Sequence, residues 1–280
     1  MSSQTHQQLA SYDTFHKAPI IGYHRAPLSQ KFGAPRQPNL VGLTSAIEMI
    51  APFDTPAAFV GLEEFSHLWL SWQFHHNRGA SNNDAKNENA SNSQSFRAQV
   101  RPPRLGGNQK IGVFASRSMY RPSQLGLSVV KLERLQVIEG RVILIISGAD
   151  MIDGTPIIDI KPYVAYSDSI EHAQSGFATD APVLLDVSMT NEAQTQFLTL
   201  INSENDAASL SSEAVISKLQ QQLVGEDKDL IQALIAQDPR PAYRRKEINT
   251  TFIMRYKSVD VSFCQNELGT LQIVAINEVL

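Results

Sequence analysis

The sequence of 280 residues contains a single cysteine, Cys264. One cysteine excludes an intramolecular disulfide and a cysteine-rich metal site, and it is typical of proteins from a reducing compartment. Cys264 lies in the alternating run VSFCQ. We therefore interpret it as a small side chain of a strand and not as a nucleophile.

Long apolar runs are also missing. Runs such as Val142 to Ile146 are much shorter than the roughly 18 residues of a membrane-spanning helix, and the N-terminal MSSQTHQQLASYDTF has no signal-peptide core. We therefore expect a soluble, cytoplasmic protein with no membrane partner. A hydrophobic fraction of 42% is sufficient for one or two globular domains.

The sequence contains none of four common motifs: the phosphate-binding GxxxxGK[ST] loop, the HExxH zinc helix, the GxSxG elbow and a GxGxxG opening a βαβ unit. Their absence argues against nucleotide-dependent phosphoryl transfer, zinc proteolysis and a doubly wound cofactor domain. Asp150, Asp153 and Asp159 surround a turn, but their spacing lacks the ligand density of a calcium loop. We expect no metal.

Acidic residues are missing from the stretch between Arg97 and Lys131, although the chain has a formal net charge of −4. The stretch, RAQVRPPRLGGNQKIGVFASRSMYRPSQLGLSVVK, contains seven basic residues, and a further basic run, PRPAYRRK, begins at Pro239. Gly- and Pro-rich turns hold guanidinium groups at fixed positions, which suits the recognition of phosphate or carboxylate. The alternative is a set of surface arginines on tight turns. Several arginine-bearing turns in one stretch without acidic residues favour a localised site for a polyanion.

Hydrophobic alternation predicts mostly strands before residue 165. The expected strands are 20–24, 68–74, 111–115, 127–138 and 141–147. His75 and His76 follow one of them, and we expect their side chains to face opposite sides of that strand. The polar stretch 81–95, SNNDAKNENASNSQS, predicts a flexible insertion.

The pattern changes after residue 167. A polar linker is followed by an expected strand at 183–189, two helical stripes at 215–223 and 230–235, and strands at 250–257, 259–265 and 271–276. This order predicts a smaller α+β domain. Aromatic residues make up only 8% of the chain, and we expect most of them at apolar strand positions.

Six segments in order resemble the TsaA-like family of tRNA methyltransferases, also called YaeB or TrmO. They are APRQPNL, GLEEFSHLWL, VRPPRLGGN, GVFASRSMYRPSQLGLS, DMIDGTPIIDIKPY and AQDPRPAYR. The resemblance implies a mainly β plus α+β fold, with a single-sheeted β-barrel at 17–168 that binds S-adenosylmethionine and a C-terminal α+β domain at 181–280. It also implies a homodimer that methylates the exocyclic nitrogen of threonylcarbamoyl-adenosine, next to the anticodon of threonine tRNA.

The resemblance implies a cofactor pocket built from five segments. Its residues are Pro35, Arg36, Gln37, His75, His76, Arg117, Leu127, Ser147, Gly148, Ala149 and Asp150. The chain departs from the family at His76, where Gln is common, and at Ser123 to Gly126, where Asn-Pro-Ile-Gly is common. His75 is the candidate catalytic base, because the acceptor nitrogen has a delocalised lone pair.

The remaining basic residues are candidates for RNA binding, because arginines pair with backbone phosphates. They are Arg101, Arg104, Arg121, Arg240, Tyr243, Arg244 and Arg245, with the tyrosine included from the same run. Two other functions remain open at this point. A non-catalytic RNA-binding module requires exposed stacking aromatics, and a small-molecule methyltransferase would use the same pocket without RNA.

Overall fold

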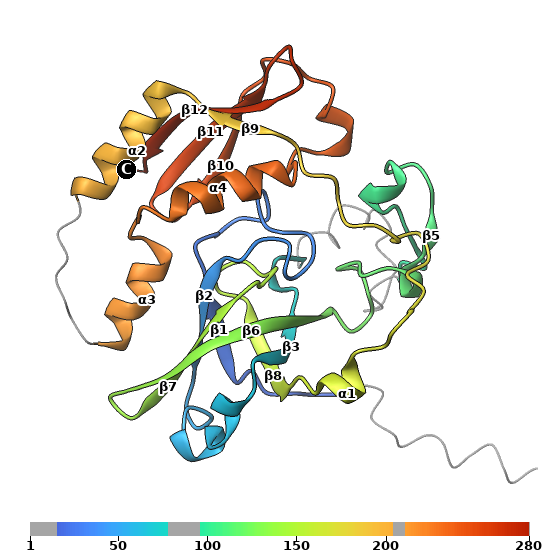
Figure 1. The fold of residues 1–280 in the computed structure, drawn as a ribbon. Coiled ribbons are helices and arrows are strands. Elements are labelled where there is room, and N and C mark those ends of the chain that lie inside the picture. Colours follow the sequence, from blue (N-terminus) through green and yellow to red (C-terminus); the bar gives the residue numbers. More distant parts are fainter. Residues whose placement is uncertain (1–15, 78–95, 204–210, 280) are drawn as a thin grey trace, which may run out of the picture.

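The computed structural model describes residues 16–77, 96–203 and 211–279. Its N-terminal part is a closed six-stranded barrel in which all neighbouring strands are antiparallel, in the order β1-β2-β7-β6-β3-β8 (Figure 1). The strands are β1 (Gly22–Arg25), β2 (Thr44–Met49), β3 (His67–Gln73), β6 (Leu125–Ile138), β7 (Arg141–Ser147) and β8 (Pro156–Pro162). The mainly β barrel and the C-terminal α+β region confirm the predicted fold class.

The C-terminal part is a four-stranded sheet with the order β10-β11-β12-β9, accompanied by three helices (Figure 1). Its elements are β9 (Val187–Met189), α2 (Asn191–Ser203), α3 (Ser212–Gln220), α4 (Asp227–Ala236), β10 (Phe252–Tyr256), β11 (Val259–Gln265) and β12 (Leu271–Glu278). A short helix, α1 (Ala165–Asp168), precedes the connecting segment. None of the helices in the described ranges has the length and apolar character to cross a membrane.

The strand predicted at 111–115 is only partly right. The structure has a two-residue strand, β5 (Ile111–Gly112), paired with β4 (Gln99–Val100), and a 3-10 turn follows at Val113–Ala115. The turn forms because Ser116 and Val113 bond through both backbone and side chain, which closes the chain on itself. The expected flexible insertion, 81–95, lies outside the described residues.

Strand β7 is buried on both faces, which explains its continuous apolar sequence. Val142, Leu144 and Ile146 point into the barrel core. Ile143 and Ile145 point outward and pack in a second cluster with helix α3. The helix therefore covers a barrel face that would otherwise expose branched apolar side chains to water.

The two parts of the molecule share a core. Leu28, Val41 and Leu43, from the segment between β1 and β2, pack with the buried side chains of α2, α4 and the C-terminal sheet. The backbone N–H of Lys257 also donates to the carbonyl of Pro27 at 2.7 Å. The β1–β2 segment, which includes residues 34–40, is therefore held between the barrel and the C-terminal part.

A buried histidine in β1, His24, links the barrel to the turn that precedes β8. His24 is 1% exposed; its Nδ1 bonds to the carbonyl oxygen of Ile152 at 3.1 Å and its Nε2 to the Oγ of Ser45 at 2.8 Å. Burial lowers the pKa of His24 from 6.5 to about 4, with a smaller contribution from Arg25, whereas the bond to Ile152 and the charge of Asp153 raise it.

We predict that His24 makes the fold sensitive to acid. Because the unfolded chain binds a proton near pH 6.5 and the folded chain only near pH 4, stability is full above pH 6.5 and falls between these values, by up to about 3 kcal/mol. Urea unfolding from pH 7.5 to 4 measures this loss. The variant His24→Gln should lose stability less steeply over the same interval. An equal slope in both proteins would assign the acid sensitivity to other groups.

Candidate functional site

Two predicted cofactor positions that are 80 residues apart meet at one end of the barrel. The Nη1 of Arg117 donates to the Oε1 of Gln37 at 2.6 Å. Arg117 remains exposed, while Gln37 is half-buried and Pro35 is buried. The bond fixes an exposed arginine side chain, whose other N–H groups can bind an anion.

The segment after β7 lies against the same loop. Gly148 has a φ of 81°, and a Cβ at this position would collide with the side chain of Asn39. Asn39 in turn donates from its backbone N to the carbonyl of Gly148 at 2.8 Å and from its Nδ2 to the carbonyl of Val129 at 3.0 Å. Asn39 therefore joins three predicted pocket segments. Asn39 belongs to the segment APRQPNL, but no sequence pattern predicted this role for it.

Asp150 is held by a chain of hydrogen bonds that starts in the barrel core. The indole Nε1 of Trp72 donates to the Oγ of Ser128 at 3.0 Å, and Ser128 donates to Asp150 Oδ1 at 2.5 Å. Burial raises the pKa of Asp150, and the Ser128 bond and the charge of Arg117 oppose this rise. A Cβ at Gly126 would collide with the Trp72 ring, so only glycine fits there. No sequence pattern indicated that Trp72 and Ser128 support Asp150.

The two adjacent histidines do not face opposite sides of a strand, so that prediction was wrong. Strand β3 ends at Gln73, and His75 and His76 lie in a 3-10 turn, where their ring centroids are 4.1 Å apart. Partial burial lowers the pKa of His75, followed by the effects of His76 and Lys31; the backbone of Gln73 and the charge of Asp153 raise it. A lowered pKa keeps the imidazole neutral at pH 7, the form that accepts a proton.

The other predicted pocket residues differ in exposure and in hydrogen bonding. Leu127 is 57% exposed on β6. Ser147 donates from its Oγ to Glu133 at 2.6 Å, which together with Lys131 lowers the pKa of that carboxyl group. Ala149 is buried in the barrel core, so its side chain cannot contact a ligand. Its contribution is restricted to the backbone.

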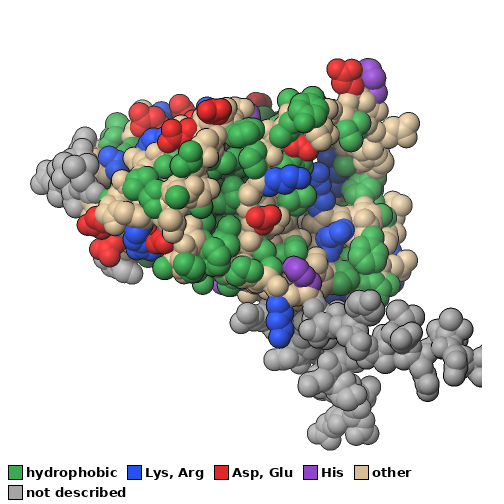
Figure 2. All heavy atoms as spheres, turned by 90° about the horizontal axis from the view of Figure 1, so that it is seen from below, with side chains coloured by type: hydrophobic (Ala, Val, Ile, Leu, Met, Phe, Trp, Pro, Cys, Tyr) green, Lys and Arg blue, Asp and Glu red, His purple; other side chains and the backbone are tan. Residues whose placement is uncertain are grey.

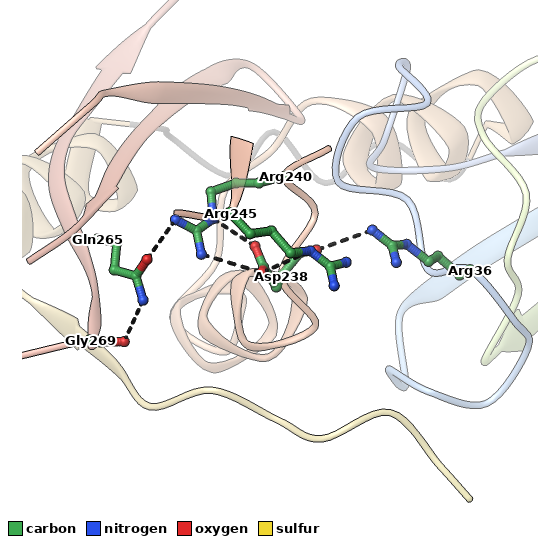
Figure 3. Close-up of polar contacts among 6 residues, drawn as sticks. All are labelled: Arg36, Asp238, Arg240, Arg245, Gln265 and Gly269. Carbon is green, nitrogen blue, oxygen red and sulfur yellow. Dashed lines mark hydrogen bonds and ion pairs between the residues drawn. The ribbon is translucent and has the colours of Figure 1, made fainter. Parts of the chain in front are cut away.

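Arg36, in the same loop, connects to a buried polar network in the C-terminal part. Its Nη2 donates to the carbonyl of Asp238 at 3.3 Å, and the Asp238 carboxylate binds Arg240 and Arg245, at 2.7 and 3.2 Å (Figure 3). Arg240 also donates to Gln265 Oε1 at 3.0 Å. Partial burial and the nearby Arg245 lower the pKa of Arg36, whereas Asp238 raises it.

The assignment of Arg240 to RNA binding requires correction. Its side chain is 1% exposed, and both its Nε and its Nη2 bond to Asp238. A guanidinium that is enclosed and already paired cannot reach a phosphate. Arg244 forms a two-point ion pair with Glu247, at 2.8 and 2.7 Å, and Tyr243 is 85% exposed. The surface of this run therefore consists of Tyr243, the half-exposed Arg244 and Arg245, and the exposed Lys246.

Arg101 and Arg104 are exposed in the β4–β5 region. Arg104 donates to the carbonyl of Asp180, so the segment that connects the two parts passes beside this region (Figure 1). Arg121 donates from its Nη1 to the carbonyl of Ser116 at 3.1 Å. Figure 2 shows basic side chains next to hydrophobic ones on the face viewed from below. Within the described ranges, no group of His, Cys, Asp and Glu side chains is arranged to hold a metal ion.

Comparison with known proteins covers both parts of the chain. Residues 23–169 match the tRNA-methyltransferase O N-terminal domain, and residues 182–279 match the TrmO C-terminal domain. The tRNA (adenine(37)-N6)-methyltransferase of Escherichia coli strain K12 is 38% identical over 229 residues, which is 81% of this chain and 83% of that protein. A putative S-adenosylmethionine-dependent methyltransferase of Pseudomonas aeruginosa is 37% identical over 247 residues, 88% and 91% of the two chains.

A solved structure shares the whole fold. The crystal structure of TrmO from Pseudomonas aeruginosa superposes with a TM-score of 0.67 at 28% identity, covering 96% of this chain and all of that one. The barrel, the site built from loops and the similar proteins together place the chain in the class of β-barrel methyltransferases. Within this class, the chain belongs to the TrmO family of tRNA methyltransferases, as the sequence resemblance implied.

We predict that Arg240 supports the fold and not RNA binding. Arg240→Met leaves Asp238 buried with its main charge partner removed, so the free energy of unfolding should fall by about 3–5 kcal/mol. Chemical denaturation measures this loss. The matched control is Arg244→Ala, on the surface of the same run, which should change stability little. A fully stable Arg240→Met protein with weakened tRNA binding would contradict this assignment.

Proposed function

We propose that the chain transfers a methyl group from S-adenosylmethionine to the exocyclic N6 of adenine 37 in threonine tRNA, when this base carries its threonylcarbamoyl group. The observation that carries the proposal is the match to both TrmO domains over nearly the whole chain. A homodimer in the cytoplasm is part of the proposal and is supported by the resemblance to the family.

The described loops fit the cofactor because they bring charges of both signs, those of Arg117 and Asp150, within electrostatic reach of each other. S-adenosylmethionine has a carboxylate, an ammonium group and a sulfonium, and its bound form supplies an electrophilic methyl group. Arg117, positioned by Gln37, can bind the carboxylate. Asp150, positioned by Ser128, can bind a cationic or hydroxyl group. The backbone of Gly148 and Ala149 completes this side of the pocket.

The acceptor nitrogen of the modified base lies between an adenine ring and a carbonyl group, so it is a weak nucleophile. Its N–H proton must leave when the methyl group passes from sulfur to nitrogen, which breaks the methyl–sulfur bond and leaves its electron pair on sulfur. The neutral His75 can accept this proton, because its lowered pKa keeps a ring nitrogen available at pH 7. Methyl transfer needs no covalent enzyme intermediate, and alignment of donor and acceptor provides most of the rate enhancement.

The RNA-binding surface that we propose has two parts. Arg101, Arg104 and Arg121 lie in the acid-free β4–β6 region, and Tyr243, Arg244 and Arg245 lie on the C-terminal part. Phosphate binding by exposed arginines releases counterions and makes affinity depend on salt. Arg240 is excluded from this surface by its burial.

A tRNA methylation assay tests the proposed activity. The purified protein should transfer labelled methyl groups to threonine tRNA that carries threonylcarbamoyl-adenosine, and transfer should fall sharply with the same tRNA lacking this group. Product analysis should locate the methyl group on N6. Cofactor binding without any tRNA methylation would favour a small-molecule methyltransferase, and RNA binding without cofactor binding would favour a non-catalytic module.

We predict that Arg117→Ala weakens S-adenosylmethionine binding about ten- to a hundredfold. The substitution removes a charge-assisted hydrogen bond, which is worth about 1.5–3 kcal/mol. Isothermal calorimetry on the folded variant measures the change. Arg134→Ala, on an exposed position of β6, is the control and should bind the cofactor as the parent does. Unchanged affinity in the Arg117 variant would remove this residue from the pocket.

A further inference from the structure

Three aromatic side chains are exposed on the loops beside the candidate site. Phe114 is 68% exposed, Phe96 is 59% exposed and Tyr120 is 37% exposed. The expectation that aromatics lie mostly at apolar strand positions is therefore wrong for this region. Exposed phenylalanine is unusual on a soluble surface, and a group of such residues marks an interaction site.

The backbone places the rings of Phe96 and Phe114 side by side. The β4–β5 pair aligns Gln99 with Gly112, and the N–H of Val113 then donates to the carbonyl of Ala98 at 2.9 Å. The residues just beyond this ladder, Phe96 and Phe114, consequently project together. Their ring centroids are 6.1 Å apart, with an angle of 30° between the ring planes.

Two of the aromatic rings, Phe114 and Tyr120, each have an arginine beside them. The guanidinium carbon of Arg121 lies 5.7 Å from the centroid of Phe114, and its Nη1 bond to the carbonyl of Ser116 fixes its position. The guanidinium carbon of Arg97 lies 4.1 Å from the centroid of Tyr120. Among the residues that the structure describes, no carboxylate forms an ion pair with either arginine. The surface is therefore both apolar and positive.

We propose that Phe96, Arg97, Phe114, Tyr120 and Arg121 form a stacking platform for unpaired nucleotides that flank the target adenine. This inference rests on the proposed function. Every unpaired nucleotide offers an apolar base face and a negatively charged phosphate, and an aromatic ring next to a guanidinium matches both features. A protein partner or a second copy of this chain would instead need acidic groups to pair with the arginines.

The position of the platform makes it a substrate-positioning element. Phe114 and Arg117 belong to one short loop, whose turn is closed by bonds from Ser116 to Val113 and from Ser118 to Ser116. A nucleotide stacked on Phe114 therefore lies close to the loop that carries the cofactor arginine. Stacking on both sides of the target would hold the base itself unstacked and available for the reaction.

The test compares Phe114→Ala with the parent by fluorescence anisotropy, using a threonine-tRNA anticodon stem-loop that carries threonylcarbamoyl-adenosine. Affinity should fall about 5- to 150-fold, as loss of one stacking contact requires. The slope of log affinity against log salt should stay unchanged, because no phosphate contact is lost, whereas Arg121→Ala should flatten it by about 1. Phe114→Trp should restore binding, and Tyr166→Ala, an exposed aromatic on α1, is the matched control.

A second RNA identifies the stacked nucleotide. Stem-loops with a single abasic residue on either side of the target should lose affinity for the parent protein. At the position that stacks on Phe114, the abasic RNA and Phe114→Ala should together lose no more than either change alone, because both delete the same contact. Fully additive losses at both flanking positions would overturn the proposal.

Three further outcomes would also overturn it. The first is an unchanged RNA affinity in Phe114→Ala. The second is a loss of S-adenosylmethionine affinity in this variant, measured without RNA, that equals its loss of RNA affinity. The third is a difference in sedimentation between the parent and the variant, which would show that the rings lie in a contact between copies of the chain. The activity of the parent protein distinguishes a failure of the platform proposal from a failure of the proposed function. If the parent methylates the tRNA and Phe114→Ala behaves identically, the platform alone is wrong, whereas a parent that does not methylate refutes the function first.

Discussion

The buried carboxylate of Asp238 is the interaction on which the relation between the two parts of the molecule depends. The carboxylate neutralises the enclosed Arg240 and binds Arg245, while the backbone carbonyl of Asp238 accepts a hydrogen bond from Arg36. An arginine without this partner would carry an uncompensated charge in the interior. The network therefore fixes the end of α4 against the loop that contains the candidate cofactor residues, and Gln37 of that loop fixes Arg117.

This arrangement divides the basic residues into two groups with different physical roles. Arg240 uses its charge inside the protein, and Arg36, although exposed, donates to the carbonyl of Asp238 and so helps to hold the cofactor loop in place. Arg97, Arg117 and Arg121 remain at the surface, where they can bind anions. A protein with net negative charge can consequently present a local positive surface to tRNA, because the acidic residues of its C-terminal helices lie elsewhere in the chain.

The exposed aromatics add to this surface a property that charge alone does not provide. Phosphate contacts hold RNA without regard to the base, whereas Phe96 and Phe114 can hold an unpaired base by its face. This loop suits the role, because hydrogen bonds of Ser116 and Ser118 within the turn fix the backbone while the rings stay exposed. The same short stretch thus serves cofactor binding at Arg117 and substrate contact at Phe114.

Local sequence pattern predicted the barrel strands β1, β3, β6 and β7, the helices α3 and α4 and the motif segments, since alternation and turn residues act over a few positions. The strands β2 and β8 and the helix α2 were not predicted from the sequence. Tertiary structure alone decided which arginines are buried, that His75 and His76 lie in a turn, and that Asn39, Trp72 and Ser128 support the site. These features depend on contacts between residues far apart in the chain, such as Arg36 with Asp238. The chemical type of Arg240 matches that of Arg244, and only the packing around each one separates a structural charge from an exposed one.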